Sequence, residues 1–375
     1  MSTEPVPGRP PRRSHRTPLR RRAVAAVCLP TALAALAATP SAVSLLSSAD
    51  SADAATPVTA AAAPAAVDPT VAVQNIFGPT SAWRKKVTSA PLNKDSAAMV
   101  ADLTKQVKSP YGINAAFNVW KYNSPIVKVS STQKRITVKF DDCQHKGYTP
   151  KNLYDGTKQF VNVPIPDSAL PAGGSDSALT VWSPDTDQLW DFWHAKRASD
   201  GWHACWGGRI DHLWTNPGYF TGGFGASASG LATGGVIRID EARRGRIDHA
   251  VSIGIRDYAS WKNISWPAQR SDGSSTSQSK IMMGSRFRLP KSVDVDKLGL
   301  TPLGKMIAVA AQDYGLIVTE KSGAVAIGTE SGALIKAKTG KDPWTAILNG
   351  TPSYEVLANF PWSRLQALPK DYGKP

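Results

Sequence analysis

Short apolar runs and runs of alternating apolar and polar residues dominate the chain from about residue 71 onward, and Gly, Pro, Asn and Asp interrupt them. This pattern is typical of β-strands with one or both faces buried. The predicted strands span residues 126–129, 135–140, 178–182, 188–194, 202–210, 235–239, 247–255, 285–289, 316–319 and 324–328. The last two flank residues 320–323, which favour a hairpin turn.

Two segments follow a helical period instead. Residues 96–108 place Met99, Leu103 and Val107 on one stripe. Residues 301–314 begin with a threonine that can cap the helix and a proline in the first turn, and a glycine follows them. Because strands prevail and do not alternate regularly with helices, we predict a mainly β protein. The expected architecture is a jelly-roll-like antiparallel β-sandwich with two or three peripheral helices.

The N-terminal residues have the composition of an export signal. Seven arginines precede residue 23, and the Ala-rich apolar run at 23–38 is too short for a stable membrane span. Residues 56–70 are rich in Ala, Pro and Thr and have little to bury. We therefore predict an export signal at 1–55, a disordered tether at 56–70 and a single β-sandwich domain at 71–375. The mature protein is expected to be a secreted monomer without a membrane contact, exported by the general or the twin-arginine route.

The chain is basic, with a formal net charge of +15. Residues 1–55 carry seven arginines against three acidic residues, which leaves +11 (15 − 4) on the remainder. Such charge favours an anionic partner such as a wall polymer or an acidic glycan, although it also serves solubility alone. No helix-turn-helix, zinc-finger or aromatic-basic RNA motif is present, so we expect no nucleic-acid partner.

Only two cysteines, Cys143 and Cys205, remain once the signal is removed. In an oxidising compartment such a pair often forms a disulfide, which we predict here. The alternative is two separate buried thiols.

Tryptophan is concentrated in one part of the chain: six of the twelve lie between residues 182 and 214. A tryptophan ring offers a broad apolar face and one hydrogen-bond donor, which suits a sugar ring. We predict that the sugar-binding residues include Trp182, Trp190, Trp193, Trp202 and Trp206. The alternative is that these rings fill the core, and strand alternation makes this the expectation for about half of them.

Two carboxylates that flank a bond, one protonated and one ionised, are the minimum for glycoside hydrolysis. In the strand at 188–194, alternation places Asp191 between large apolar side chains, where burial would raise its pKa. Glu241 opens a short turn before the strand at 247–255. We predict Asp191 and Glu241 as the catalytic pair, with Asp248 as a substitute. A carboxylate bonded to a neighbouring backbone group or arginine is the structural alternative.

The strand at 247–255 also carries His249, at the end of an apolar row. His249 either orients a catalytic carboxylate or is a core histidine with satisfied hydrogen bonds. A polysaccharide lyase would need such a base and an arginine that neutralises a uronate. Arg286 and Arg288 share a strand face and are the candidates for that role, unless they form a solvated edge.

Metal and phosphate chemistry have little support in the sequence. No histidine spacing matches a transition-metal motif, and we predict neither a metal nor another cofactor. His194, His203 and His212 recur every nine residues and would have to align on adjacent strands to form a metal site. The glycine-rich segment 221–230 lacks the lysine and the following helix of a phosphate loop and is predicted to be a flexible surface loop.

Five segments together resemble a family of secreted actinobacterial β-rich proteins. They are LWDFWHAKRASDGWHACWGG, GGVIRIDEARRGRIDHAVSIGI, ISWPAQRSDG, MGSRFRLP and LGKMIAVAAQDYG. The resemblance covers most of the chain after about residue 74. It implies export and one shared architecture without naming a reaction. Its motifs contain Asp191, Glu241, His249, Arg286 and Arg288.

The leading hypothesis is a secreted glycoside hydrolase with paired carboxylates in a tryptophan-lined groove. A polysaccharide lyase that acts on acidic glycans is one alternative. A non-catalytic carbohydrate-binding or cell-wall-associated module is the other. In each case the expected partner is an extracellular polysaccharide or a cell-wall glycan.

Overall fold

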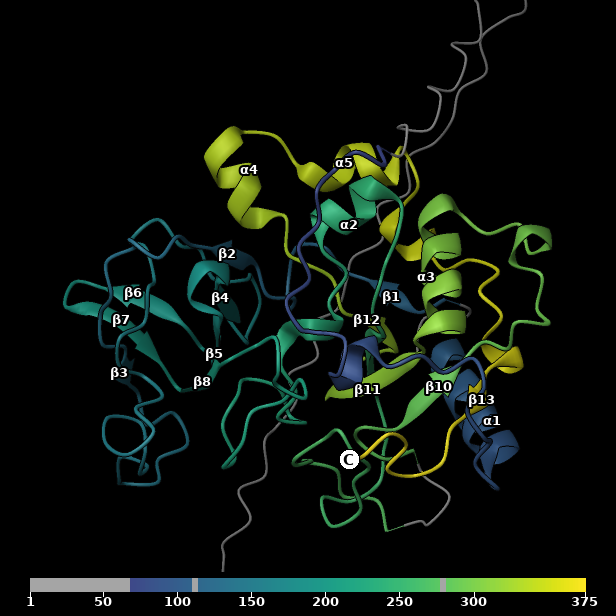
Figure 1. Ribbon diagram of the computed structural model, residues 1–375, viewed down its shortest axis with the longest axis horizontal. Helices are drawn as coiled ribbons and strands as arrows, with labels where there is room; N and C mark the ends of the chain where they lie inside the picture. Colours follow the sequence, from purple (N-terminus) through teal and green to yellow (C-terminus); the bar gives the residue numbers. More distant parts are fainter. Residues whose placement is uncertain (1–67, 110–113, 277–280) are drawn as a thin grey trace, which may run out of the picture. The chain divides into compact units, whose positions relative to one another are not determined.

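The computed structural model describes residues 68–109, 114–276 and 281–375, all within one compact unit that spans residues 60–375 (Figure 1). The predicted export signal and nearly all of the predicted tether lie outside the described residues. The boundaries of the signal, the tether and the single domain therefore stay predictions. In the part that the structure describes, no helix is long and apolar enough to cross a membrane.

The larger sheet has six strands in the order β1-β12-β9-β11-β10-β13. Their bounds are β1 Ala116–Phe117, β9 Val251–Ile255, β10 Arg286–Arg288, β11 Leu316–Lys321, β12 Ala326–Ile327 and β13 Gln366–Ala367. The central neighbours β9 and β11 are parallel, whereas β12 and β10 run antiparallel to them. Because β9 and β11 end at the same edge, the residues that follow them are brought together there. The carboxyl end of parallel strands is a common position for ligand sites.

Two smaller sheets lie earlier in the chain. The four-stranded sheet has the order β2-β4-β5-β8 and comprises β2 Ile126–Lys128, β4 Leu179–Ser183, β5 Gln188–Trp193 and β8 Trp206–Asp211. The three-stranded sheet has the order β3-β7-β6 and comprises β3 Lys139–Phe140, β6 Lys196–Ala198 and β7 Gly201–Ala204. The Cys143–Cys205 disulfide is present, as predicted. It ties the loop after β3 to the junction of β7 and β8.

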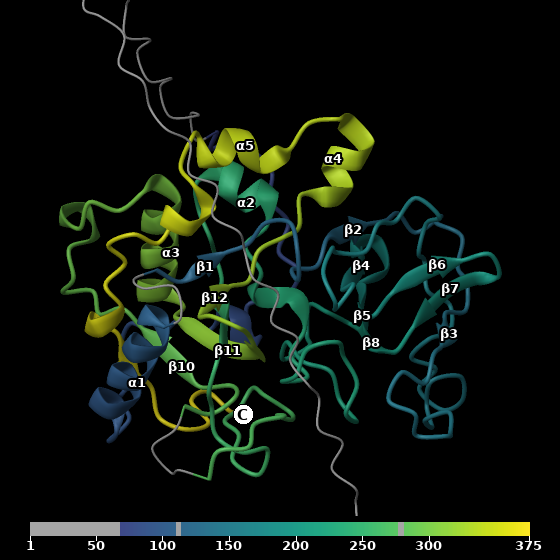
Figure 2. The ribbon, with the colours of Figure 1, turned by 180° about the vertical axis from the view of Figure 1, so that it is seen from behind.

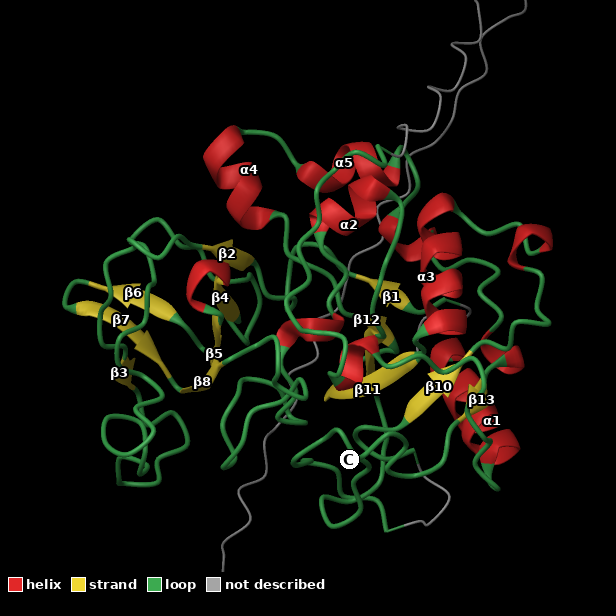
Figure 3. Ribbon diagram, in the orientation of Figure 1, coloured by secondary structure: helices red, strands yellow, loops and turns green. Residues whose placement is uncertain are grey.

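Five α-helices and six short 3₁₀ helices complete the described part (Figure 3). The α-helices are α1 Ser96–Lys108, α2 Ile239–Arg244, α3 Pro302–Asp313, α4 Ala333–Thr339 and α5 Pro343–Leu348. The 3₁₀ helices are η1 Ala82–Arg84, η2 Pro184–Thr186, η3 Thr233–Gly235, η4 Val295–Lys297, η5 Ser353–Glu355 and η6 Trp362–Arg364. Both predicted helices are confirmed. Thr301 caps α3 by accepting a hydrogen bond from the Gly304 N–H, and Gly315 adopts a left-handed φ of 86° just after it.

The core has two main apolar clusters, and β11 contributes to both. Val318 packs with α1 and α3 residues such as Leu103 and Ile307, whereas Ile317 packs with the large side chains of the four-stranded sheet, including Trp190. Consecutive strand residues point to opposite faces, so β11 is buried on both sides. Figures 1 and 2 show α1 and α3 close to β10 and β13 on the larger sheet.

The sheet-rich prediction is confirmed in its coarse form, but the sheets are not closed and a jelly-roll sandwich is not confirmed. Two local predictions are wrong. The predicted hairpin at 320–323 does not exist, because β9 lies between β11 and β12. Residues 235–239 form no strand: Ile237 makes one isolated bridge, to Thr329, and the chain then enters α2.

The small residues of β9 have a packing role. A Cβ at Gly235 or Gly328 would lie 3.0 or 3.3 Å from the Ser252 Cβ, so glycine lets these segments approach the strand. The row of small side chains on β9 therefore admits a second layer of chain.

Candidate functional site

Asp191 is the first predicted catalytic residue, and its carboxylate is enclosed within the four-stranded sheet. The side chain is only 4% exposed. It accepts hydrogen bonds from the Thr180 hydroxyl at 2.6 Å and from the Thr233 hydroxyl and N–H at 2.7 and 3.1 Å. Burial raises the pKa of Asp191 to about 6, and these three hydrogen bonds limit the rise. The carboxylate therefore joins β4, β5 and the segment at Thr233.

Glu241 is fully buried, at the start of α2. One carboxylate oxygen lies 3.0 Å from His249 Nε2 and accepts a 3.1 Å hydrogen bond from the Arg238 N–H. The other lies 3.2 Å from the Arg238 guanidinium. Burial opposes ionisation, but His249 and Arg238 outweigh it and lower the pKa of Glu241 to about 2. Glu241 thus has the structural role of a buried, paired carboxylate.

Two further carboxylates, Glu330 and Asp240, surround the same helix end. Glu330 accepts a 2.9 Å hydrogen bond from the Ile239 N–H, and Asp240 pairs with Arg238 at 3.2 Å. Negative groups are favoured at a helix N-terminus, where backbone N–H groups lack intrahelical partners. We call Glu241, Glu330, Asp240, Arg238 and His249 the Glu241 cluster.

The predicted catalytic pair is not brought together in an accessible groove. No contact among the described residues joins Asp191 to Glu241, and both carboxyls are shielded from solvent. The proposed substitute, Asp248, is held by Arg244 at 2.9 Å and by Arg246 at 2.6 Å. This geometry gives these acids structural partners and does not support their use as the acid and base.

Arg286 and Arg288 also have partners within the protein. Arg286 is 3% exposed and donates to the carbonyls of Tyr314 and Lys85. Arg288 donates to the Gln366 side chain and to the Val87 carbonyl. Both arginines join β10 to neighbouring segments and do not form the solvated edge considered above. Because Arg286 is buried, a uronate cannot reach it.

The tryptophans divide between the core and the surface. Trp182, Trp190 and Trp202 are at most 4% exposed and belong to the core, so their predicted sugar contact is not supported. Trp193 and Trp206 are half-buried. The division does not follow the strand faces, because the buried Trp182 pairs with Leu189 and so shares a face with Trp193 and Trp206.

The spaced histidines do not converge in the described part, where no group of three or more metal-ligating side chains is found. His203 lies on β7, and each of its two ring nitrogens is 2.9 Å from a carboxylate oxygen, one of Asp141 and one of Asp200. These two hydrogen bonds raise its pKa above the usual value.

A different acid, Glu320, is positioned by an irregularity near the end of β11. The ladder pairs Val318 with Ile253 and Glu320 with Gly254, so β11 has one extra residue between the two pairs. Such a bulge changes the direction of the side chains that follow it and often occurs near active sites. The Glu320 carboxylate accepts a 2.8 Å hydrogen bond from the Ala228 N–H.

The surroundings of Glu320 favour its protonated form. The residue is half-buried, and burial raises its pKa to about 7. Hydrogen bonds from the Ala228 and Lys321 N–H groups favour the charged form, whereas the carboxylates of Asp272 and Asp176 raise the pKa further. An acid with this pKa can carry a proton at neutral pH and donate it in a reaction.

Asp272 provides a second acid beside Glu320. It is exposed, and its carboxylate accepts a hydrogen bond from the hydroxyl of the buried Tyr258. Burial, and then Asp272 itself, raise the pKa of Tyr258, so its hydroxyl remains a donor. The hydrogen bond fixes one carboxylate oxygen of Asp272 at the surface.

Arg270 holds the glycine-rich segment 221–230 against these acids. Its guanidinium donates to the carbonyls of Gly223, Gly225 and Ser227, the last two at 2.7 and 2.6 Å. The Ala228 N–H that binds Glu320 follows directly. This segment therefore has specific anchors, in contrast to the flexible loop that its composition predicts.

Two tryptophans are hydrogen-bonded to segments of this group. Trp261 is 62% exposed, and its backbone N–H donates to the carbonyl of Gly273, the residue after Asp272. Trp193 donates from its indole to Asp176 at 3.4 Å. We call Glu320, Asp272, Asp176, Tyr258 and Arg270 the Glu320 cluster.

Sequence reasoning missed the Glu320 cluster because its members are far apart in the chain. The bulge in β11 has no clear sequence signal, and Glu320 was assigned to a hairpin turn. One usable signal was the segment ISWPAQRSDG, which contains Arg270 and Asp272 and contributes to the family resemblance.

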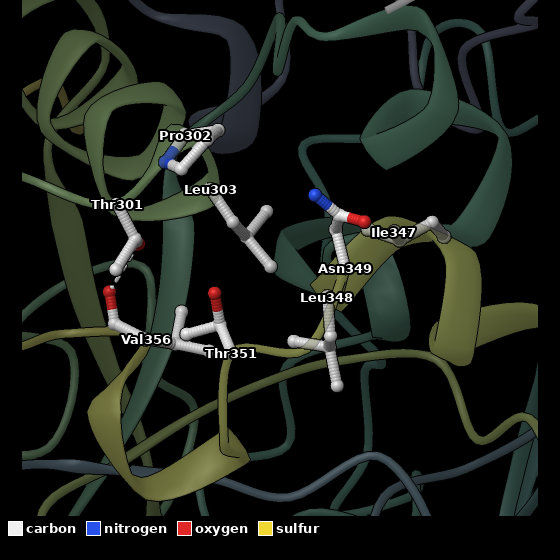
Figure 4. Close-up of a pocket in the computed structure, with 8 residues that line it drawn as sticks. All are labelled: Thr301, Pro302, Leu303, Ile347, Leu348, Asn349, Thr351 and Val356. Atoms are coloured by element: carbon white, nitrogen blue, oxygen red, sulfur yellow. Dashed lines mark hydrogen bonds between the residues drawn. The ribbon is translucent and has the colours of Figure 1, made fainter. Parts of the chain in front are cut away.

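The described residues line an apolar and a polar cavity, among others. An apolar cavity of about 200 Å³ lies between α3 and α5 and is lined by Leu303, Ile347, Leu348 and Val356, among others (Figure 4). It contains no titratable side chain. A polar cavity of about 440 Å³ lies between α1 and the carboxyl ends of β9 and β11.

No family model, curated protein or solved structure matches this chain.

Proposed function

We propose that the protein is a secreted, polysaccharide-active glycoside hydrolase whose site is the Glu320 cluster. The observation that carries this proposal is the convergence of three carboxylates, on Glu320, Asp272 and Asp176. One of them, Glu320, has its pKa raised to about 7, and the backbone of the exposed Trp261 is hydrogen-bonded to Gly273, next to Asp272. The proposed reaction class is the one predicted from the sequence, but the proposed catalytic residues are no longer Asp191 and Glu241.

Glu320 would act as the general acid. It would donate its proton to the glycosidic oxygen as the bond to the anomeric carbon breaks, so that the leaving sugar departs as an alcohol. Its raised pKa supports this role, because an acid whose pKa lies near the working pH combines a high protonated fraction with ready proton transfer.

Asp272 would supply the second carboxylate. It would either take a proton from the attacking water or attack the anomeric carbon itself, and Tyr258 would keep one of its oxygens in place. Separations of about 5 Å and of about 6.5–9.5 Å between the carboxyls correspond to retention and inversion, respectively. Asp176 supports the pair by disfavouring ionisation of Glu320.

The exposed ring of Trp261 would stack on a sugar unit near Asp272. Trp193, which is bonded to Asp176, would contact a unit on the other side. Of the five predicted sugar-binding tryptophans this proposal keeps Trp193, and it adds Trp261.

Export and a sandwich-like packing of the sheets are part of the same proposal. The Cys143–Cys205 disulfide agrees with an oxidising compartment. Ile317 of β11 belongs to the same apolar cluster as core residues of the four-stranded sheet, which supports a sandwich-like arrangement. N-terminal sequencing of the protein from a culture medium would test the export signal.

The test is the release of reducing ends from a panel of plant, fungal and bacterial polysaccharides. We expect wild type to cleave at least one of them, and Glu320→Gln or Asp272→Asn to lower the rate by about 10²–10⁴-fold. The matched control is Glu330→Gln, because burial raises the pKa of Glu330 to about 7 as well and it also accepts a backbone N–H. The control should keep wild-type activity. Retention of activity by both test variants would refute the assignment.

A non-catalytic carbohydrate-binding module is the second candidate, and the 62% exposure of Trp261 favours it. In that case no polysaccharide of the panel would be cut, and Trp261→Ala would abolish binding to an insoluble polysaccharide while Asp272→Asn would not. The lyase alternative has less support, because His249 and Arg286 are both buried.

A further inference from the structure

One guanidinium fastens the glycine-rich segment 221–230. One terminal nitrogen of Arg270 donates to the Gly223 carbonyl, and the other donates to the carbonyls of Gly225 and Ser227 at 2.7 and 2.6 Å. Three carbonyls from alternate residues therefore converge on one side chain. Arg270 is half-buried, and a planar guanidinium with five donors suits several acceptors spread around it.

Glycine allows the backbone of the segment to present these carbonyls. Gly223 and Gly225 have φ of 82° and 94°, in the left-handed region that L side chains rarely adopt. A Cβ at Gly225 would clash with the Phe220 ring. The Gly225 N–H also donates to the Gly207 carbonyl at 3.0 Å, which joins the segment to β8. The conformation that Arg270 binds is therefore specific to this sequence.

The fastened segment reaches the carboxylate of Glu320. Ser227 is followed by Ala228, whose N–H donates to Glu320 Oε2 at 2.8 Å. The next carbonyl, that of Ser229, accepts a 3.2 Å hydrogen bond from the backbone N–H of Arg270. Arg270 thus binds the carbonyls on both sides of Ala228, one through its side chain and one through its backbone. The Ala228 N–H is held in place on Glu320 as a result.

Arg270 also acts on this carboxylate through its charge. Burial lowers the pKa of Arg270, and the nearby carboxylates of Glu320 and Asp272 oppose that change. The carboxylates of Asp272 and Asp176 raise the pKa of Glu320. The Ala228 N–H and the positive charge of Arg270 act in the opposite direction, because both stabilise the ionised form of Glu320.

We propose that Arg270 is the positioning residue of the acid Glu320: through the carbonyls of segment 221–230 it holds the Ala228 N–H on Glu320 Oε2 and so orients the carboxyl group. The inference rests on the proposed function, in which Glu320 donates a proton to the glycosidic oxygen. The other oxygen of Glu320 accepts a 2.9 Å hydrogen bond from the Lys321 N–H. If the segment were released, Lys321 would still hold that oxygen, but the carboxyl group could rotate about it.

The test compares Arg270→Gln with the matched control Arg135→Gln. Arg135 is also half-buried and donates to several acceptors, among them the Asn162 carbonyl at 2.9 Å and the Gln188 side chain at 3.0 Å. NMR of protein with labelled glutamate carboxyl carbons gives the pKa of Glu320, and the spectrum of Glu320→Gln assigns its signal. The constants kcat and KM are measured across pH on the polysaccharide that wild type cleaves.

We expect the pKa of Glu320 to rise above its wild-type value in Arg270→Gln, because two interactions that favour the charged form are lost or weakened. The basic limb of the pH profile should move to higher pH. With the acid displaced, kcat should fall by about 10–10²-fold while KM changes little. Arg135→Gln should alter kcat by less than about 2-fold and leave the pKa of Glu320 unchanged, since its partners lie outside the Glu320 cluster.

Arg270→Lys separates position from charge, and it replaces Arg270→Gln as the test if that variant does not fold. Its ammonium group keeps the positive charge but donates from a single point, which does not match three carbonyls spread along the segment. We therefore expect kcat to stay about 10-fold or more below wild type. The pKa of Glu320 should be closer to the wild-type value than in Arg270→Gln.

Three results would overturn the inference: an unchanged pKa of Glu320 in Arg270→Gln, an equal change in Arg135→Gln, or wild-type kcat in Arg270→Lys. A raised pKa of Glu320 in Arg270→Gln, in a protein that cleaves no polysaccharide, keeps the positioning role and removes the hydrolase. Cleavage by Arg270→Gln with the wild-type kcat and pH profile keeps the hydrolase and removes the positioning role.

Discussion

Two glutamates ten positions apart, Glu320 and Glu330, have the same local electrostatics and different surroundings. Both are half-buried and accept a backbone N–H, and burial raises the pKa of each to about 7. Glu330 binds the end of α2 beside the enclosed Glu241–His249 pair. Glu320 interacts with the exposed Asp272, whose carboxylate raises the pKa of Glu320 further. A raised pKa therefore marks a carboxylate as a candidate catalytic acid. Whether it can act on a substrate depends on its access to solvent and on a second acid nearby.

The largest expected effect is on catalytic rate, and it should distinguish Glu320 from Glu330 through the leaving group of the substrate. Glu320→Gln should reduce cleavage of a polysaccharide by about 10²–10⁴-fold. It should retain far more activity on an aryl glycoside of the same sugar, since a good leaving group needs no proton. Glu330→Gln should cleave both substrates like wild type. If Glu320→Gln lost the same fraction of activity on both substrates, the variant would have a structural defect, and Glu320 and Glu330 would not differ in catalytic role.

The next effect concerns stability, and it should be large only in the Glu241 cluster. Glu241→Ala leaves His249 buried without its anionic partner and Arg238 with only Asp240, which should cost about 3–5 kcal/mol in the free energy of unfolding. Asp272→Ala removes an exposed acid and the hydrogen-bond acceptor of Tyr258, and should cost about 1–2 kcal/mol. Chemical denaturation of both variants checks this. If Asp272→Ala proved as costly as Glu241→Ala, the description of Asp272 as a surface group would be incorrect.

The smallest effect is a pH dependence that both glutamates should share. Their folded-state pKa values of about 7 lie above the ordinary value of 4.5, so the folded protein holds the proton more tightly than the unfolded chain. This contribution to stability is complete below pH 4.5 and is lost as the pH rises through about 7. Glu320→Gln and Glu330→Gln should each flatten the decline in melting temperature over that interval. A variant with the wild-type slope would show that its glutamate does not titrate there.

The fold shows which features local sequence can specify. The helix at α3 was predicted correctly because Thr301, Pro302 and Gly315 act within one or two turns of the chain. The disulfide was predictable because Cys143 has only one possible partner outside the signal. Alternation along β5 placed Asp191 among apolar side chains, and burial does raise its pKa. It could not show that two threonines would enclose that carboxylate.

The sequence by itself determined the strand-rich composition, the capped helix α3 and the cysteine pair. Each of these depends on residues close in the chain or on a choice with one solution. Only the tertiary structure decided which acids meet, because Glu320, Asp272 and Asp176 are brought together by three separate segments and a bulge in β11. The same packing buried Glu241 with His249 and Arg238, since carboxylates in the interior require partners, whereas Asp272 at the end of its segment stayed exposed.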